Sequence, residues 1–259
     1  MVEQAEGLKR RLRLAVASLR VGADPQQNLR RVQACIAQAS EAGAELVCLP
    51  EYCLNPVMEH WVDLEAPIQT LCSACRRHRI WAVLGAERGN HDARHNSILL
   101  LSPDGAVYAS YDKVHLWGHE RQHFLPGTAA APVVDIGSCR LGLICCWDMA
   151  FPGDVSDLAT RGAELILCPS RLVDYQLDAE PLRALPLARA FENLVYFVLC
   201  DALSDDTLAD DSLSECMICH PLGIRHRIAR SEGMLIADRD LNALAELRAY
   251  YRGDGREDG

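Results

Sequence analysis

The sequence has 259 residues, of which 49% are hydrophobic and 24% are charged, as in an ordinary globular protein. Its formal net charge is −10, which excludes the basic surface that nucleic acids and anionic membranes attract, so we expect neither as a partner. No run of about 18 uncharged apolar residues is present, so the sequence predicts no membrane-spanning helix.

The first part of the chain predicts a strand, a helix and a second strand. Residues 12–19 alternate as in a strand. In residues 25–43 the apolar side chains recur at helical spacing, with a proline suited to the first turn and a glycine suited to the C-terminal cap. Residues 44–51, AELVCLPE, form a nearly continuous apolar run, which is typical of a buried strand.

The rest of the chain continues this mixture. A hairpin is predicted over 97–113, and SECMICHP with IRHRIAR supplies two more strands. The mixture indicates an α/β fold. No composition break divides the chain, so we expect one domain over 1–252 and a charged, glycine-rich, disordered tail at 253–259. The remaining predicted helices cover 64–79, 153–162, 181–193 and 241–251, and the remaining strands cover 80–87, 139–147, 163–170, 195–201 and 233–241.

The N-terminal residues and the cysteines indicate a compartment. Basic residues precede a short apolar stretch, but Arg13 and Arg20 interrupt that stretch and no small-residue cleavage site follows. We therefore expect a cytoplasmic protein. Many of the twelve cysteines lie in apolar runs, and we expect reduced, buried thiols rather than a disulfide framework.

Three kinds of reactive side chain follow predicted strands. Glu51 follows a buried strand and Lys113 ends the hairpin, and a cysteine pair ends strand 139–147. Ligands bind at the carboxyl ends of strands in α/β sheets, although each residue alone would more often be a surface or core side chain. Strand side chains alternate, so one of Cys145 and Cys146 should face the site and the other the core, and the pattern does not choose between them.

Together these residue types suit one chemistry. A thiol loses its proton to attack a carbonyl or nitrile carbon, and a carboxylate can take that proton and later give it to a departing amine. An ammonium group and a backbone N–H can hold the negative oxygen of the tetrahedral intermediate. Carboxylate, lysine and cysteine therefore suffice for amide hydrolysis, and we expect no metal and no cofactor.

The sequence resembles the nitrilase, or carbon–nitrogen hydrolase, superfamily along almost its whole length. Such a set of motifs in the family's order is specific, although each motif alone is weak. The resemblance implies a four-layer α-β-β-α sandwich with two mixed sheets flanked by helices, and at least a homodimer. The matching stretches are LPEYCL, HNSILLLSPDG, YDKVHLWGHERQHFLPG, GLICCWDMAFPG, ARAFENLVYFV, SECMICHPLG and ADRDL.

The resemblance also implies the role of each site residue. The family nucleophile stands two residues before an acidic position, and this assigns Cys146, of Cys146-Trp147-Asp148, as nucleophile. Glu51 is then the general base, and Lys113 with the Trp147 N–H stabilises the oxyanion. Glu120 matches the family's second glutamate, which orients the site. Two positions depart from the family motif, Ala150 and Gly153, and the small Ala150 would open the substrate pocket.

The substrate class stays open between three families of compound. KVHLWGHER resembles amidases that act on aliphatic and amino-acid amides, whereas Cys-Trp-Asp is similar to N-carbamoylputrescine amidases, and nitrilases generally show Cys-Trp-Glu. Arg171 would suit a carboxylate-bearing substrate, and the acidic loops would suit an amine. The residues expected to contact substrate are Tyr52, His119, Phe124, Arg171 and Tyr175.

Three motifs of the sequence are also compatible with metal sites. HERQH at 119–123 matches the H-E-x-x-H zinc pattern, but glycine and proline nearby leave little room for a long helix. Cys72 and Cys75 with Cys216 and Cys219 form a four-cysteine pattern that core packing explains better. The acidic loop, Asp205, Asp206, Asp210 and Asp211, lacks EF-hand spacing. A family member that only binds a ligand is the alternative to an enzyme, and the dimer interface is expected at RAFENLVYF, 189–197, and the C-terminal segment.

Overall fold

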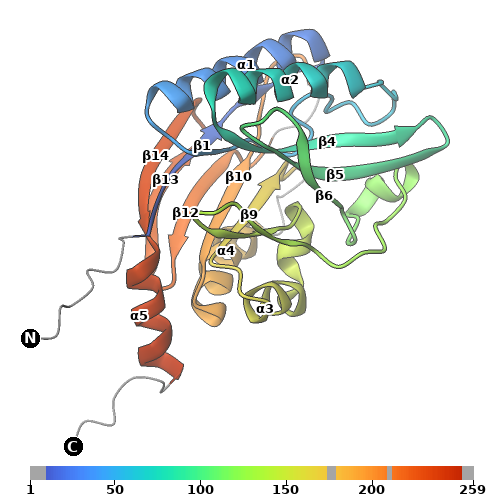
Figure 1. The fold of residues 1–259 in the computed structure, drawn as a ribbon. Helices are drawn as coiled ribbons and strands as arrows, with labels where there is room; N and C mark the ends of the chain where they lie inside the picture. The colour runs from blue at the N-terminus through green and yellow to red at the C-terminus, as the bar shows by residue number, and fades with distance from the viewer. Residues whose placement is uncertain (1–9, 174–178, 209–211, 253–259) are drawn as a thin grey trace, which may run out of the picture.

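The strands of the chain form two six-stranded sheets that pack face to face (Figure 1). The computed structural model describes residues 10–173, 179–208 and 212–252, so the predicted tail at 253–259 lies outside the described residues. The first sheet has the order β14 (Gly233–Asp240), β1 (Arg11–Ser18), β3 (Leu46–Cys48), β4 (Trp81–Asn90), β5 (Ala93–Leu101), β6 (Val107–Asp112).

The second sheet repeats this arrangement. Its order is β13 (Gly223–Ala229), β12 (Glu215–His220), β10 (Tyr196–Asp201), β9 (Leu165–Ser170), β8 (Arg140–Leu143), β7 (Val133–Asp135). In each sheet three inner strands are parallel, β1-β3-β4 in the first and β8-β9-β10 in the second. The strands that pair with them are antiparallel to them, β14 and β5 in the first sheet and β12 and β7 in the second. The edge strands β6 and β13 pair antiparallel with β5 and β12. A short pair, β2 (Arg20–Val21) with β11 (Leu203–Ser204), lies apart from both sheets.

Helices cover the outer face of each sheet. The first sheet is covered by α1 (Pro25–Glu41) and α2 (Glu65–His78), and the second by α3 (Pro152–Thr160) and α4 (Ala179–Asn193) (Figure 1). The last helix, α5 (Leu241–Arg252), extends away from the layers (Figure 1). The predicted four-layer α-β-β-α sandwich is therefore confirmed.

Strand alternation divides the buried side chains between two cores. In β1, Leu14 and Val16 point between the sheets, whereas Ala15 and Ala17 point towards the helices. On the helix side Val32, Ile36 and Ala39 of α1 meet them at helical spacing. Strands buried on both faces explain the continuous apolar runs of the sequence. The larger buried cluster fills the space between the sheets and continues under α3 and α4, and its residues extend from Leu12 to Leu244. The domain boundary at residue 252 stays a prediction.

The predicted elements form, with differences at short segments. The strand predicted over 139–147 ends at Leu143, and η2, a 3₁₀ helix over Cys146–Ala150, follows it. Sequence periodicity missed β2, β7, β11 and a second 3₁₀ helix, η1 (Gly118–Gln122), because segments of two to five residues show no period. Within the described ranges, no helix combines the length and apolar character that crossing a bilayer requires.

Candidate active site

Four predicted site residues meet where strands of both sheets end. Glu51 lies three residues after β3, Lys113 directly follows β6, and Glu120 belongs to η1. Cys146 follows β8 of the second sheet. The Glu51 N–H donates to the carbonyl of Ser170 at the end of β9, which ties the two sheets together at this edge. The carboxyl ends of the parallel strands thus bring distant segments to one pocket.

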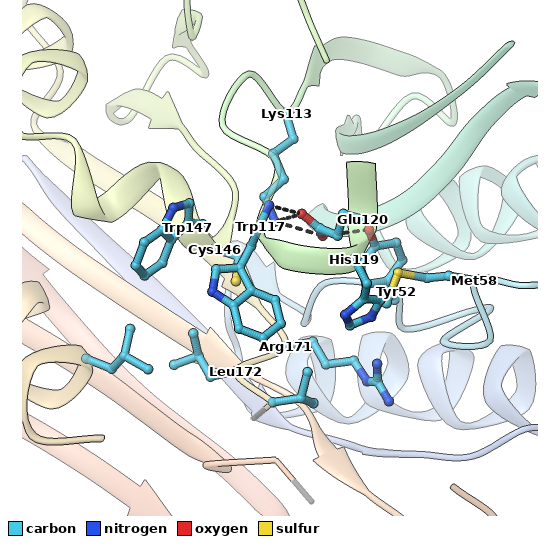
Figure 2. Close-up of a pocket in the computed structure, with 12 residues that line it drawn as sticks. Tyr52, Met58, Lys113, Trp117, His119, Glu120, Cys146, Trp147, Arg171 and Leu172 are labelled. Atoms are coloured by element: carbon cyan, nitrogen blue, oxygen red, sulfur yellow. Dashed lines mark hydrogen bonds and ion pairs between the residues drawn. The ribbon is translucent and has the colours of Figure 1, made fainter. Parts of the chain in front are cut away.

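Lys113 lies between two carboxylates in a buried ion network. Its Nζ is 2.9 Å from Oε1 of Glu51 and 2.9 Å from Glu120, and Lys113 and Glu51 are both 1% exposed. Burial lowers the pKa of Lys113, but the charge of Glu51, and further charges in the site, raise it well above its usual value. The ammonium group therefore stays charged, and Figure 2 shows it pointing into the pocket.

Glu51 is also held by neutral donors. Oε1 accepts from Asn96 Nδ2 at 2.6 Å, and Oε2 accepts from the Arg171 N–H at 2.8 Å. Burial raises the pKa of Glu51, but the Lys113 charge and the hydrogen bonds from Asn96, Cys145 and Lys113 outweigh it and hold this pKa below the usual range. The carboxylate is therefore ionised and able to accept a proton.

Cys146 is presented by an unusual backbone turn. Its φ is 46°, a left-handed value that only a tightly held non-glycine residue adopts. Asp148 holds the turn, since its carboxylate accepts from the N–H of Cys145 at 3.0 Å and from the Tyr111 hydroxyl at 2.9 Å. Burial and the charge of Glu51 raise the pKa of the Cys146 thiol well above its usual value, so the sulfur needs a base before it can attack.

The alternation expected of the two cysteines fails at this turn. Cys146 lines the pocket, as expected of one member of the pair. The other, Cys145, does not face only the core, because its Sγ lies 3.1 Å from Oε1 of Glu51. Alternation holds within an extended backbone, and the left-handed φ of Cys146 ends the extended backbone between the two residues.

The carboxylate of Glu120 is held by several hydrogen bonds beside Lys113. Besides Lys113 it accepts from the Tyr52 hydroxyl at 2.8 Å, from Asn96 at 3.1 Å and from the Trp117 N–H at 2.7 Å. These four partners fix its carboxylate against Lys113. The residue predicted to orient the site is thus placed beside the residues it would orient.

The geometry can be compared with known proteins. A model of the carbon–nitrogen hydrolase family matches residues 13–249. This chain belongs to that family. It is 31% identical over 194 residues to a protein of Pyrococcus abyssi named nitrilase, covering 71% of each chain. It is 27% identical over 258 residues to the human omega-amidase NIT2, covering 91% of each chain.

A solved structure shows the same fold. A variant of the amidase from Nesterenkonia sp. AN1, in which the acetamide moiety of fluoroacetamide is added covalently at the active-site cysteine, has 26% sequence identity and a TM-score of 0.83. The match covers 95% of this chain and 97% of the other. The chain is thus a carbon–nitrogen hydrolase of the nitrilase superfamily, an enzyme of the amidase-like type.

The pocket of this hydrolase contains three of the five residues expected to contact substrate. Tyr52, His119 and Arg171 line it, and the indoles of Trp117 and Trp147 flank the Cys146 sulfur in the view of Figure 2. The complete lining is Tyr52, Met58, Lys113, Trp117, His119, Glu120, Cys146, Trp147, Arg171, Leu172, Val173 and Leu182. Mostly apolar walls surround a charged end, which suits a small substrate with one polar reacting group.

Phe124 and Tyr175 are the other two residues predicted to contact substrate. Phe124 lies outside this lining, and its ring packs 5.7 Å from that of Tyr52 and 4.8 Å from the Arg94 guanidinium carbon. Phe124 thus packs behind Tyr52 of the pocket wall, and its contact with substrate stays a prediction. Tyr175 lies outside the described residues.

Asn96 is the site residue that sequence reasoning missed. It is fully buried in β5, and its amide donates to both Glu51 and Glu120. A polar side chain within the apolar strand HNSILLL is the signal that could have found it, because a buried amide needs buried partners. Trp117 and the residues Leu172, Val173 and Leu182 were missed because their positions depend on how loops and α4 close over the pocket.

The structure separates the residues of the other motifs. The first four residues of HERQH lie in the 3₁₀ helix η1, and His123 is its C-cap. Side chains four positions apart do not share a face in such a helix, and the glutamate of the motif is bound to Lys113. Cys72 and Cys75 belong to α2 over the first sheet, whereas Cys216 and Cys219 belong to β12 of the second sheet, and the two pairs lie in different buried clusters. Asp205 pairs with Arg31 at 3.1 Å, and Asp210 and Asp211 lie outside the described residues.

Proposed function

We propose that this hydrolase cleaves the C–N bond of a small linear amide through a thioester on Cys146, releasing ammonia. The observation that supports the proposal best is the buried Glu51–Lys113–Glu120 network beside Cys146 in one pocket. It supplies a base, a cation and a nucleophile within reach of one reacting carbon. The mechanism uses side chains and a backbone N–H alone.

In the first half-reaction Glu51 takes the proton of Cys146 while the sulfur bonds to the amide carbon. The carbonyl electron pair moves to oxygen, where Lys113 Nζ and the Trp147 N–H hold the negative charge. Trp147 lies in the first turn of η2, where a backbone N–H has no acceptor within its own helix. The tetrahedral intermediate then collapses, the C–N bond breaks, and Glu51 gives its proton to the leaving ammonia.

In the second half-reaction a water molecule attacks the thioester. Glu51 takes a proton from this water as the oxygen bonds to the carbon, and the second tetrahedral intermediate is held by the same two donors. Its collapse breaks the C–S bond, releases the acid and returns the proton from Glu51 to the Cys146 sulfur. Glu120 keeps Lys113 in place during both halves.

The largely apolar lining of the pocket, with the guanidinium group of Arg171, supports an amide as the substrate. Met58, Leu172, Val173 and Leu182 offer no hydrogen bonds to a second polar group, whereas Arg171 of the same wall suits a carboxylate. A neutral aliphatic amide or an amide with a distal carboxylate therefore fits better than an N-carbamoyl amine. The N-carbamoyl amines and nitriles are the second and third candidates, and a role in binding alone is the fourth.

Ammonia release tests the substrate class. The purified enzyme is offered matched pairs of neutral and carboxylate-ended amides, N-carbamoyl amines and nitriles. We expect turnover with the amides. Because Arg171 can pair with a carboxylate, the carboxylate-ended member of each pair should have the lower KM. Arg171→Leu should remove this difference in KM. Turnover confined to carbamoyl compounds or nitriles would contradict the amide proposal, and stoichiometric binding without ammonia would favour the binding role.

We propose a homodimer as the assembly. Phe191 of α4 is 52% exposed, and Leu222 and Ile224 beside it are 51% and 42% exposed, so three apolar side chains line one groove. A two-fold axis would bury this groove against its copy. Light scattering should give twice the chain mass, and Leu222→Glu should halve it; a monomeric wild type would contradict the proposal. The rest of segment 189–197 contributes less, because Val195 to Phe197 are buried in the fold.

A cytoplasmic location is part of the same proposal. All twelve cysteines are free and all but Cys35 are buried, which suits a reducing compartment. Cell fractionation tests it, and recovery of the enzyme with secreted or periplasmic proteins would contradict it.

A further inference from the structure

The second thiol of the cysteine pair contacts the catalytic carboxylate. Cys145 is fully buried, and its Sγ lies 3.1 Å from Oε1 of Glu51 and 3.8 Å from Oδ1 of Asn96. An ionised carboxylate only accepts hydrogen bonds, so the S–H is the donor in this contact. Burial and the charge of Glu51 raise the pKa of the Cys145 thiol well above its usual value, so the sulfur keeps its proton and remains a donor.

This contact completes a set of donors on one oxygen. Oε1 of Glu51 accepts from Asn96 at 2.6 Å, from Lys113 at 2.9 Å and from Cys145 at 3.1 Å. Within the described residues Oε2 accepts one hydrogen bond, from the Arg171 N–H. A carboxylate offers about four lone-pair sites, two on each oxygen. The three donors share the two sites of Oε1, and among the described residues one lone pair of Oε2 stays without a donor.

The two oxygens of Glu51 differ in the number of hydrogen-bond donors that a proton would displace. A proton arriving on Oε1 would have to displace one of three donor groups, N–H or S–H, that already occupy this oxygen. A proton arriving on Oε2 would displace none of these donors. The three contacts on Oε1 therefore favour the ionised form of Glu51 and direct proton exchange to the other oxygen.

We propose that Cys145 is a positioning residue, whose thiol helps to lock Oε1 so that Glu51 exchanges its proton with Cys146 through Oε2. In that exchange the S–H bond of Cys146 breaks, the O–H bond forms on Oε2, and the sulfur electron pair attacks the substrate carbon. Cys145 itself neither gains nor loses a proton. The inference rests on the proposed function, because it needs Glu51 as base and Cys146 as nucleophile.

Cys145→Ala and Cys145→Ser form a matched pair of variants, because alanine and serine are both smaller than cysteine and only serine donates a hydrogen bond. We measure kcat and KM with one amide from about pH 4 to about pH 9. In Cys145→Ala the charged form of Glu51 loses a donor, so its pKa rises. The acid limb of kcat/KM should then move up by about 0.5 pH unit, and kcat should fall about 3- to 10-fold with little change in KM. Cys145→Ser should restore both to within about twofold of the wild type.

A second buried cysteine, outside the site, provides the control for the volume that Cys145→Ala removes from the core. Cys219 of β12 is also fully buried, and Cys219→Ala should leave the acid limb unchanged. If Cys145→Ala fails to fold, as judged by circular dichroism, Cys145→Val fills the space without a donor and takes its place. Equal pH profiles for the Ser variant and the variant without a donor would overturn the inference.

Failure of the inference and failure of the proposed function give different results. If Cys146→Ala is inactive while the Cys145 variants all match the wild type, only the role of Cys145 is overturned. If Cys146→Ala keeps wild-type turnover, the proposed function itself is wrong. The same preparation of enzyme and the same amide serve for both measurements.

Discussion

Replacing Cys146 with alanine is expected to lower the rate of amide turnover by at least about 1000-fold, because no thioester can form and only binding and the oxyanion donors remain. The fold should persist, since alanine and cysteine face the same cost at the φ of 46° and the sulfur lies at a pocket wall. Ammonia release at saturating amide measures the loss, and a thermal melt checks the fold.

Cys168 provides the control for this prediction. Its Sγ lies 3.7 Å from the carbonyl oxygen of Cys146, so Cys168→Ala perturbs the same neighbourhood and leaves the nucleophile intact. We expect its turnover to stay within about threefold of the wild type. Near-normal turnover in Cys146→Ala would show that another group forms the covalent intermediate, and Cys145, at 3.1 Å from Glu51, would be tested next.

Lys113→Met should damage both catalysis and stability. Loss of an oxyanion donor lowers kcat by about 100- to 1000-fold. The same change leaves two buried carboxylates, Glu51 and Glu120, without the cation between them, and breaking a buried pair in this way costs about 3–5 kcal/mol. Urea unfolding measures the free energy, and kcat is measured in parallel on the folded variant.

A double variant separates the two effects. Glu120→Gln removes one of the two uncompensated charges, so Lys113→Met with Glu120→Gln should recover part of the lost stability. It should not recover kcat, because no donor returns to the oxyanion. Recovery of kcat together with stability would mean that Lys113 only neutralises its neighbours, and the role assigned to its ammonium group would be wrong.

Sequence periodicity predicted most of the strands because the inner strands of both sheets are buried on both faces, whereas the arrangement in four layers was predicted from the family resemblance. Runs such as AELVCLPE and AELILCPS have no polar interruption, and a strand covered by a helix layer and a second sheet needs none. The helices over 25–43 and 64–79 were equally visible, since each buries one apolar stripe. Segments that follow no period, such as η1 and η2, were not predicted.

The sequence predicted the main residues of the site but not how the neighbouring side chains contact them. Family resemblance selected Glu51, Lys113, Glu120 and Cys146. The structure places the last three in the lining of one pocket and Glu51 in contact with Lys113, while their roles stay predictions. Periodicity could not place Cys145, because alternation has no meaning across a left-handed residue. The positions of Asn96 and Phe124 follow from tertiary contacts between β5, η1 and the loop after β3, which local pattern does not contain.

The proposed nucleophile and the proposed base belong to different sheets. Glu51 and Lys113 follow strands of the first sheet, Cys146 follows a strand of the second, and the layer between them is filled by fully buried side chains such as Cys200, which contacts the carbonyls of Ala17 and Cys48. A change of volume in that layer shifts one reactive group against the other, and a displacement of about 1 Å can cost about 100-fold in rate. New substrate preferences should therefore arise by substitution of pocket residues such as His119 and Leu172. The buried residues between the two sheets should tolerate few substitutions.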